Sequence, residues 1–358
     1  MTVLGIDARA ATEEPAGRGR YVRELLRALA RRSDDHTYLL FARSRWGEAL
    51  DARFKWQLVS SRDPLWNFRA ARAASSACSA FLSSNSYLTA WFLQVPSVVV
   101  VYDLVAFQPG IQARRSSGLI ERATIGLGIR RAARLLCISE ATRRDLALRY
   151  PHSAEKSSVV PLAADERFGP VSAERIEEVR RRHGLDPEFV LCTGTLEPRK
   201  NLVRVLDAHR GLSRPVQLAL VGPRGWEYEP ILEAAGARDD VRVLGQVPDD
   251  DLVALYNACT VFCYPSLYEG FGLPLLEAMA AGAACVTSSL SSLPEVGGDA
   301  VVYVDPTDVT AIRAAIDRLL NSDVERAAFG EQAKRRAATF SWDKTAADTL
   351  AALAAVGR

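Results

Sequence analysis

Long hydrophobic segments are absent from this sequence. A membrane-spanning helix needs roughly 18 or more predominantly apolar residues, whereas the longest candidate, FLQVPSVVVVY (92–102), is short and contains Pro96. The N-terminus, MTVLGIDARA, carries Asp7 before any long apolar stretch, unlike a signal peptide. The sequence therefore predicts a cytoplasmic protein without a membrane span of its own.

Metal-binding and redox motifs are lacking as well. Cys259 and Cys263 are too far apart for a CxxC motif, and no histidine stands at metal-ligand spacing from a cysteine. The six cysteines lie mostly in apolar runs, which predicts buried, reduced thiols. The acidic run DDD (249–251) is predicted to cap a helix, and no Asp-x-Asp stands at the end of a predicted strand. We therefore expect no cofactor and no required divalent metal.

Charge is unevenly distributed along the chain. With 358 residues, 48% of them hydrophobic and 25% charged, the sequence is typical of a globular protein long enough for two domains. Residues 1–165 contain 24 Lys and Arg against 15 Asp and Glu, a balance of +9, and the remainder has a balance of −7. The two halves therefore favour different partners. Nucleic acid is not an expected partner, because no known nucleic-acid-binding motif accompanies the basic residues.

Short apolar runs alternate with helical patterns in both halves of the chain. The predicted strands are 2–8, 37–42, 56–60, 97–103, 134–139 and 157–162 in the first half, and 189–194, 216–222, 241–245, 260–265, 284–289 and 300–304 in the second. Continuous apolar strands separated by helices predict parallel sheets that are covered on both faces. We therefore predict an α/β protein of two doubly wound, Rossmann-like domains, over 1–165 and 170–340, facing a central cleft.

The loops after the predicted strands are the expected binding sites, because open α/β sheets bind ligands at the carboxyl ends of their strands. After the first strand, Gly17 and Gly19 precede a helix, where backbone N–H groups can approach an anion closely. After strand 189–194, Arg199 and Lys200 stand at a helix start and favour a phosphate site. The alternatives are a plain flexible loop and a solvated, charged helix start.

The stretch YPSLYEGFGLPLLEAM carries two carboxylates. Gly270 and Gly272 predict a tight loop after a strand. Pro274 suits the first position of a helix, which places Glu277 in the first turn, from where its carboxylate can reach a ligand at the helix start. Glu269 lies in the glycine loop itself. The alternative is that Glu277 only complements the helix dipole and that Glu269 is solvated.

These motifs, taken in order, resemble those of the GT-B glycosyltransferases, in particular the retaining group called family 4. EGFGLPLLE resembles the E-x7-E motif of that family, and GTLEPRKNL resembles its phosphate-binding segment. GRGRYVREL looks like its N-terminal glycine loop and helix. VVYDLVAFQPG resembles its His-Asp-Leu segment, and CISEATRRDL resembles its Ser-Glu-x-Ser/Thr-x-x-Asp-Leu segment. The resemblance covers nearly the whole chain.

The resemblance implies a nucleotide-diphospho-sugar donor that is held mainly by the second domain. Arg199 and Lys200 match the cationic pair that holds the diphosphate. Glu277 matches the glutamate that hydrogen-bonds the donor ribose, and Glu269 matches the glutamate near the donor sugar. Further donor contacts are implied for Gly17, Thr195, Gly270, Phe271, Gly272 and Leu273.

For the first domain, the resemblance implies a role in acceptor binding. Tyr102, Asp103 and Ser139 match positions on the acceptor or sugar side, and the segment 341–358 matches a C-terminal helix that crosses back onto this domain. Two positions depart from the family pattern. Tyr102 stands where the family usually has His, and a tyrosine can hydrogen-bond a sugar hydroxyl but cannot act as a base near neutral pH. Thr195 stands where many members have Arg, a charge that Arg199 supplies instead.

The implied reaction is retaining transfer of a hexose, with Glu269, Arg199 and Lys200 as catalytic residues. Negative charge grows on the leaving diphosphate, and cations aimed at that charge stabilise the transition state. GDP-mannose is the favoured donor, and a glycan or a lipid-linked saccharide is the expected acceptor. Transfer of rhamnose or another deoxysugar is an alternative.

Two other classes of function stay open at this point. A hydrolase could use Glu269 and Glu277 as its acid and nucleophile, but it would not need a diphosphate-binding Arg-Lys loop. A catalytically silent subunit that only binds sugar nucleotides is the third hypothesis, and Tyr102 in place of His is the feature that favours it.

Basic and aromatic residues are interleaved in the first half. The segment 43–74 contains Trp46, Trp56, Trp66 and Phe68 among arginines and a lysine, and the segment 113–136 adds a second basic stretch. Such faces suit an anionic membrane surface, and a solvated helix face is the alternative. The membrane interpretation predicts peripheral contact with the inner face of the cytoplasmic membrane and a lipid-linked acceptor.

Overall fold

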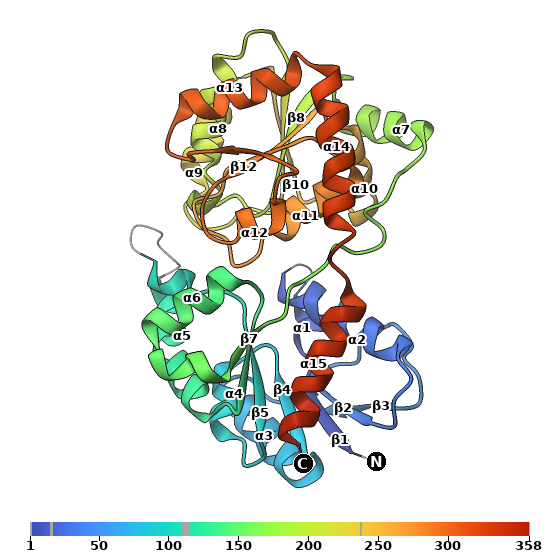
Figure 1. The fold of residues 1–358 in the computed structure, drawn as a ribbon, viewed down its shortest axis with the longest axis vertical. Helices are drawn as coiled ribbons and strands as arrows, with labels where there is room; N and C mark the ends of the chain where they lie inside the picture. Colours follow the sequence, from blue (N-terminus) through green and yellow to red (C-terminus); the bar gives the residue numbers. More distant parts are fainter. Residues whose placement is uncertain (1, 15–16, 109–114, 237, 358) are drawn as a thin grey trace. The chain divides into compact units, whose positions relative to one another are not determined.

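A computed structural model divides the chain into two compact units (Figure 1). Unit 1 consists of Met1–Leu162 together with Ser341–Arg358, and unit 2 is Ala163–Phe340. The structure describes residues 2–14, 17–108, 115–236 and 238–357, and within 115–121 it describes the backbone. No helix in these ranges is both long enough and apolar enough to cross a membrane.

Unit 1 contains a parallel sheet of seven strands in the order β3-β2-β1-β4-β5-β6-β7. The strands are β1 (Val3–Asp7), β2 (Thr37–Ala42), β3 (Phe54–Leu58), β4 (Ala80–Ser83), β5 (Ser97–Val101), β6 (Arg134–Cys137) and β7 (Ser157–Val159). At the centre of the sheet, Ile6 of β1 lies opposite Leu40 of β2 on one side and Leu82 of β4 on the other. All five residues of β5 are buried, so both faces of the sheet are covered at this strand.

The helices of unit 1 pack on the sheet in two groups. They are α1 (Ala10–Glu13), α2 (Arg18–Arg31), α3 (Leu65–Ala77), α4 (Tyr87–Phe92), α5 (Arg115–Arg131), α6 (Glu140–Arg149) and α15 (Trp342–Val356), with the 3-10 turns η1 (Val105–Phe107) and η2 (Pro151–Lys156). Helix α4 contacts both α3 and α5, whereas α15 packs on α2. Trp342 of α15 meets Tyr21 of α2 with ring centroids 6.1 Å apart, and Thr345 Oγ1 donates to the carbonyl of Pro161 at 2.6 Å. The C-terminal helix is therefore part of unit 1.

Unit 2 contains a parallel sheet of six strands in the order β10-β9-β8-β11-β12-β13. The strands are β8 (Phe189–Thr193), β9 (Gln217–Val221), β10 (Val241–Gly245), β11 (Val261–Tyr264), β12 (Cys285–Ser288) and β13 (Val302–Val304). The helices are α7 (Ala173–His183), α8 (Leu202–Arg210), α9 (Glu229–Ala235), α10 (Asp249–Ala258), α11 (Leu273–Ala281), α12 (Leu293–Gly297), α13 (Val309–Leu320) and α14 (Asp323–Ala337), with the 3-10 turn η3 (Pro198–Lys200). Val190 and Cys192 of β8 join the apolar core formed with α8, α9 and α13. Leu191, which points to the opposite face, is equally buried, so this sheet is covered on both faces.

The prediction of two doubly wound parallel sheets is confirmed, with one strand missed in the first half. The missed strand is β4, whose four residues, Ala-Phe-Leu-Ser, follow the Ala- and Ser-rich end of α3. It lacks the β-branched residues that mark β5, and its place between β1 and β5 comes from burial on all four residues rather than from local preference. Strand β3 also begins at Phe54, two residues before the predicted start.

Each sheet has one point where the order of the strands reverses. In unit 1 it lies between β1 and β4, because the chain runs outward through β2 and β3 on one side and through β5 to β7 on the other. In unit 2 it lies between β8 and β11. Ligands bind outside the carboxyl ends of the strands at such a point, so the loops after β8 and β11 define the candidate site of unit 2.

Candidate active site

The loop after β8 carries Arg199 and Lys200 in η3, directly before α8. The sequence predicts Arg199 and Lys200 at the start of a helix. In the structure, Asn201, in the left-handed conformation with φ 62°, separates η3 from α8. The amide of Asn201 donates to the carbonyl of Pro265 at 3.1 Å, and the N–H of Leu267 donates to the carbonyl of Arg199 at 2.9 Å. These bonds join the loops after β8 and β11.

Arg199, Lys200 and Glu269 meet where these two loops join, and we call them the charged triad. Lys200 Nζ lies 2.6 Å from Glu269 Oε1, and Arg199 Nη1 lies 2.6 Å from Glu269 Oε2. The hydroxyl of Tyr264 donates to Glu269 Oε1 at 2.8 Å, and Arg199 also pairs with Glu197 at 2.6 Å. Lys200 and Glu269 are each only 7% exposed. The sequence prediction did not include this direct pairing of the two cations with Glu269.

Burial and the neighbouring charges set the protonation states of Glu269, Lys200 and Tyr264. Burial by itself would raise the pKa of Glu269, but Arg199 and Lys200 outweigh it and lower this pKa to about 2. Burial and the neighbouring Arg199 lower the pKa of Lys200, against the opposing effect of Glu269. Burial, followed by the charge of Glu269, raises the pKa of Tyr264 well above its usual range. At neutral pH, Glu269 is therefore a carboxylate and Tyr264 a neutral phenol.

A pair of serines after β12 holds the backbone of the glycine loop. Ser291 Oγ accepts from the N–H of Glu269 at 2.9 Å, and the single hydroxyl of Ser292 lies within hydrogen-bonding distance of the carbonyls of Glu269 at 2.9 Å and Phe271 at 2.8 Å. Ser291 has φ 54°, and Ser292 is fully buried. The sequence prediction omitted both serines, although they follow a predicted strand, which is the position that could have revealed them. They set the course of the chain through Gly270 into α11.

Glu277 lies in the second turn of α11, not in the first as predicted. Gly272, with φ 104°, precedes the first helical residue, Leu273, so that Pro274 takes the second helical position. Glu277 is 2% exposed, and the hydroxyl of Tyr256 lies 3.3 Å from its Oε2. The same hydroxyl lies 2.8 Å from Thr193 Oγ1 at the end of β8. Glu277 is therefore built into the interior of unit 2 and is not a solvated helix-start charge.

The backbone at Gly194 and Thr195 lies close to the end of β9. A Cβ atom on Gly222 would come within 2.0 Å of the carbonyl oxygen of Gly194, so glycine is required there. A Cβ on Gly194 would lie 3.1 Å from Cε of Lys200. Thr195 is half-buried in this turn. The close packing fixes the start of the loop that carries Arg199 and Lys200.

In unit 1, the predicted acceptor-side residues lie at the ends of β5 and β6. Tyr102 and Asp103 follow β5. The Tyr102 hydroxyl donates to the carbonyl of Ser84 at 2.7 Å, and Asp103 Oδ1 accepts from the N–H of Val105 at 3.0 Å. Ser139 is buried and caps α6 by accepting from the N–H of Thr142. Tyr102 and Ser139 thus have structural roles within unit 1, and burial raises the pKa of Tyr102 well above its usual range, so it is not a base.

Gly17 precedes α2 with φ 55°, a conformation that other residues rarely adopt. The carbonyl of Gly17 accepts from the N–H of Tyr21 in the first turn of the helix. Pro15 and Ala16, which belong to the same predicted anion-binding loop, lie outside the described residues.

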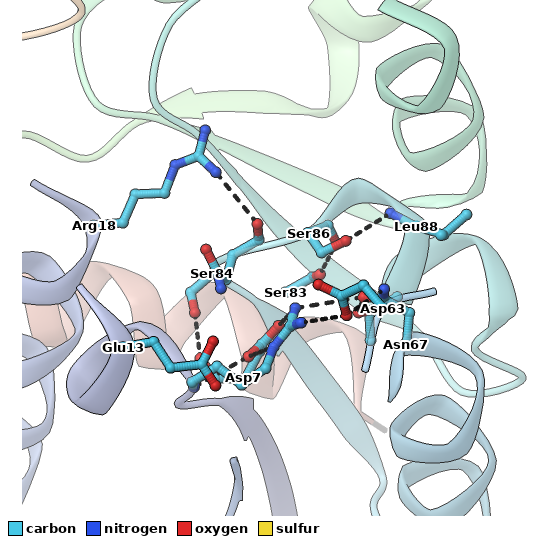
Figure 2. Close-up of polar contacts among 12 residues, drawn as sticks. Asp7, Glu13, Arg18, Asp63, Asn67, Ser83, Ser84, Ser86 and Leu88 are labelled. Atoms are coloured by element: carbon cyan, nitrogen blue, oxygen red, sulfur yellow. Dashed lines mark hydrogen bonds and ion pairs between the residues drawn. The ribbon is translucent and has the colours of Figure 1, made fainter. Parts of the chain in front are cut away.

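A polar network at the reversal point of the first sheet, with Asp7, Arg9 and Asn67 buried, was not predicted (Figure 2). Arg9, after β1, pairs with Asp7 and Asp63 at 2.9 Å each and stacks on Trp66 with its guanidinium carbon 3.6 Å from the ring centroid. Asn67 Nδ2 donates to Asp63 Oδ1 at 3.0 Å. Figure 2 also shows Ser84 and Ser86, from the loop between β4 and α4, in the same region. This network ties the loop after β1 to α3.

Two further sequence interpretations require correction. Four aromatic residues were proposed to face a membrane. Trp66 is fully buried, Trp46 and Trp56 are half-buried, and Phe68 is exposed. Residues 113 and 114 at the start of the second basic segment lie outside the described residues.

Asp249, Asp250 and Asp251 occupy the first turn of α10 and do not cap it. The buried Asp251 instead pairs with Arg175, Arg182 and His183 of α7. In the described ranges, no three His, Cys, Asp or Glu side chains group as a metal site would require.

Comparison with known proteins identifies the family. The model described as Glycosyltransferase Family 4 matches residues 15–168, and the model described as Glycosyl transferases group 1 matches residues 175–336. The two matches correspond to units 1 and 2, so each half of the chain matches a glycosyltransferase family model, and the second half matches group 1.

Curated relatives of this chain include mannosyltransferases. The chain is 38% identical to O-antigen chain mannosyltransferase B of Escherichia coli over 224 residues, which are 60% of this chain and 59% of that protein. It is 36% identical to MMP alpha-(1->4)-mannosyltransferase of Mycolicibacterium hassiacum over 232 residues, 62% of this chain and 54% of that protein. The matches thus span little more than half the length of these relatives.

Solved structures extend the comparison to the whole fold. HepE from Anabaena, in complex with UDP and glucose, aligns with a TM-score of 0.77 over 99% of this chain and 100% of that chain, at 19% identity. WaaG, a glycosyltransferase involved in lipopolysaccharide biosynthesis, aligns with a TM-score of 0.73 over 98% of this chain and 99% of that chain, at 16% identity. The predicted GT-B fold, with two Rossmann-like domains, is confirmed.

Proposed function

We propose that this glycosyltransferase moves a hexose of the mannose type from a nucleotide-diphospho-sugar to a glycan or lipid-linked saccharide, with retention of the anomeric configuration. The charged triad at the reversal point of the second sheet carries the proposal. It joins two cations and one carboxylate where an open α/β sheet binds its ligand. The names of the two relatives, both mannosyltransferases, support the mannose-type donor.

Arg199 and Lys200 are assigned to the donor diphosphate. Glu269 and Glu197 hold the guanidinium of Arg199, and Glu269 and Tyr264 hold the ammonium of Lys200, so both cations are fixed before the reaction begins. Cations fixed in a partly dehydrated site stabilise the negative charge of a departing diphosphate more than mobile ones would. The side chain of Arg199 is 20% exposed and that of Lys200 is 8% exposed, so Arg199 is the more accessible donor of hydrogen bonds.

Glu269 is assigned to the sugar end of the donor and Glu277 to the ribose. A general acid must be protonated at the working pH, and a carboxyl group with a pKa of about 2 is ionised at pH 7. This ionisation argues against a hydrolase that uses Glu269 as its acid. An ionised Glu269 can instead stabilise the positive charge that develops on the sugar as the anomeric bond breaks.

The proposal includes GDP-mannose as the favoured donor and no required divalent metal. Arg199 and Lys200 supply the positive charge that a metal would otherwise bring to the diphosphate. Transfer should therefore continue after the protein has been treated with EDTA. Loss of transfer in EDTA, with recovery on addition of magnesium, would overturn the metal-independent form of the proposal.

The direct test measures binding and turnover separately. Thermal unfolding is followed with GDP, UDP and dTDP sugars, because a ligand at 100 times its Kd stabilises the folded state by about 2.7 kcal/mol. The stabilising donor is then incubated with saccharide acceptors, and the anomeric configuration of the product is determined by NMR. Stabilisation by dTDP-rhamnose instead of GDP-mannose would favour the deoxysugar alternative. Stabilisation without transfer or hydrolysis would favour the silent binding subunit.

A matched pair of variants tests the assigned cation. Arg199→Gln should lower kcat roughly 100-fold or more, the usual loss when one donor to a developing charge is removed. Arg210→Gln, in an exposed ion pair at the end of α8, should leave kcat unchanged. Full activity of Arg199→Gln would remove Arg199 from the catalytic role.

We also propose that the protein works in the cytoplasm, in peripheral contact with the inner face of the cytoplasmic membrane. All six cysteines are unbridged, which supports a reducing compartment. A lipid-linked acceptor would bring the enzyme to the membrane. Cell fractionation in low and high salt tests this location, and recovery of the protein from the soluble fraction under both conditions would contradict the membrane contact.

A further inference from the structure

Unit 1 exposes an apolar surface on α3 and α4. We call it the α3–α4 patch and define it by six residues: Leu65, Phe68, Arg69 and Arg72 of α3, with Trp91 and Phe92 of α4. The four apolar members are 46%, 46%, 43% and 37% exposed in sequence order, although residues of this kind are usually buried. Both arginines are exposed as well.

The members of the patch from α3 lie on one face of the helix. Leu65, Phe68, Arg69 and Arg72 stand at positions i, i+3, i+4 and i+7, the spacing of one helical face. The opposite face of α3 is buried through Trp66 and Ala70, which belong to the core of unit 1. The patch residues therefore lie on the solvent-facing side of α3, and the side that carries Trp66 and Ala70 packs in the core.

Helix α4, the next helix along the chain after strand β4, completes the patch. Helices α3 and α4 pack together, and the rings of Phe68 and Phe92 meet edge-on with centroids 5.6 Å apart. Trp91 precedes Phe92 and is exposed beside it. Two helices thus bring exposed aromatic side chains together at Phe68 and Phe92, and clustered exposed apolar side chains mark interaction sites.

Helices α3 and α4 themselves carry only positive charge. The segment 64–96, which contains both helices, has Arg69 and Arg72 and no acidic residue. Arg131, at the end of α5, adds a third guanidinium, which donates to the carbonyl of Leu93 at 3.0 Å just after α4. Asp63, at the start of α3, is held by Arg9 and Arg43. A partner with negative charge around an apolar interior fits this surface.

We propose that the α3–α4 patch is the surface by which unit 1 docks on an anionic lipid bilayer. The aromatic rings would enter the boundary between head groups and acyl chains, and the arginines would pair with lipid phosphates. This inference rests on the proposed peripheral membrane contact and names its surface. Of the aromatic residues that the sequence suggested, it keeps Phe68 and leaves out the buried Trp66, and it adds Trp91 and Phe92, which lie outside that segment.

Vesicle binding tests the proposal with matched variants. Binding is measured by co-sedimentation with phosphatidylcholine vesicles and with vesicles in which phosphatidylglycerol replaces about a third of the lipid. Wild type should bind the second kind, less strongly as salt increases. One arginine near such a surface strengthens binding roughly fivefold, so the double variant R69Q/R72Q should bind about 25-fold more weakly. The double variant F68S/F92S should also lose most of its binding.

Controls exposed elsewhere separate the patch from general charge and hydrophobicity. R144Q/R181Q removes two exposed arginines, and Leu148→Ser removes an apolar side chain that is 79% exposed. Both should bind vesicles as wild type does. Circular dichroism and thermal unfolding confirm that each variant is folded.

Transfer to a water-soluble acceptor, measured on the same samples, separates this inference from the proposed function. F68S/F92S should keep wild-type transfer while it loses vesicle binding. Equal binding of wild type to neutral and anionic vesicles, or unchanged binding of both patch variants, would overturn the inference. If the wild type is a dimer and F68S/F92S is a monomer, the α3–α4 patch binds a second copy of the chain, and the proposed bilayer contact is overturned. Vesicle binding by an enzyme that transfers no sugar would refute the function and leave the docking surface standing.

Discussion

Replacing Glu269 by Gln should destabilise unit 2 strongly, because it leaves two cations next to each other without their shared carboxylate. Lys200 is 7% exposed and its ammonium lies 2.6 Å from Glu269. Removing one partner of a buried ion pair costs roughly 3–5 kcal/mol. The pKa of Glu269, about 2 against an ordinary value of 4.5, leads to a similar figure of about 3 kcal/mol. For a domain of this size, that corresponds to a fall in Tm of about 10 °C.

The pH dependence of the unfolding free energy separates the effect of the charge on Glu269 from the effect of its shape. The pKa of Glu269 is lower in the folded state than in the unfolded state, so its contribution is fully present above pH ~4.5 and is lost as the pH falls toward 2. Glutamine does not titrate. The difference in unfolding free energy between wild type and Glu269→Gln should therefore be constant above pH ~5 and shrink below it.

Thermal and urea unfolding of the two proteins from pH 7 to pH 3 provides the measurement. Glu197→Gln is the control, because it breaks the pair with Arg199 but leaves the pair between Lys200 and Glu269 intact. It should cost less than Glu269→Gln, because Arg199 keeps its pair with Glu269. The double variant K200M/E269Q should lose less stability than the sum of the two single variants, since neither charge is then left alone. A loss below 1 kcal/mol for Glu269→Gln, or a difference that does not change with pH, would refute this account of the triad.

Three further substitutions test single features of the fold. Gly272→Ala should lower the free energy of unfolding in urea by about 1–3 kcal/mol, because φ at Gly272 is 104° and a Cβ there would lie 2.7 Å from Leu293. Gly245→Ala is the control and should cost less, because φ at Gly245 is 66° and a Cβ there would meet no atom within 4 Å. Tyr102→Phe should cost about 1 kcal/mol in thermal unfolding by removing the bond to the Ser84 carbonyl, and an unchanged Tm would contradict it. Ser292→Ala should cost about 1–3 kcal/mol and lower kcat, and its recovery by Thr would show that the hydroxyl holds the glycine loop.

The strands and helices were largely predictable because their signals are local. Strands such as β5 and β9 are runs of apolar residues that are buried throughout, and the period of α2 matches a helix with one buried face. Strand β4 escaped prediction because its four residues have no such signal. Its neighbours β1 and β5 supply the hydrogen bonds and the burial that make it a strand.

The charged members of the candidate site were predictable, but their arrangement was not. Arg199, Lys200 and Glu269 follow predicted strands, so sequence reasoning could list them. Their pairing depends on β8 and β11 being neighbours in the sheet, although the paired residues lie 69 and 70 positions apart in the chain. The same holds for Ser291 and Ser292, which reach the glycine loop from β12.

Surface placement showed the clearest limit of sequence reasoning. Trp66 and Phe68 are two residues apart on α3, yet Trp66 is buried under Arg9 and Phe68 is exposed. Which face of a helix is covered depends on the sheet and on the neighbouring helix, and the α3–α4 patch exists because α4 brings Trp91 and Phe92 beside α3.

The sequence by itself determined the fold class, the family resemblance and the charged residues of the candidate site, because apolar periodicity and ordered motifs are properties of neighbouring residues. The tertiary structure decided which charges pair, which carboxylate is buried and which aromatic side chains remain exposed. Those properties depend on the order of the strands and on the packing of helices against them, which join residues that the chain keeps far apart.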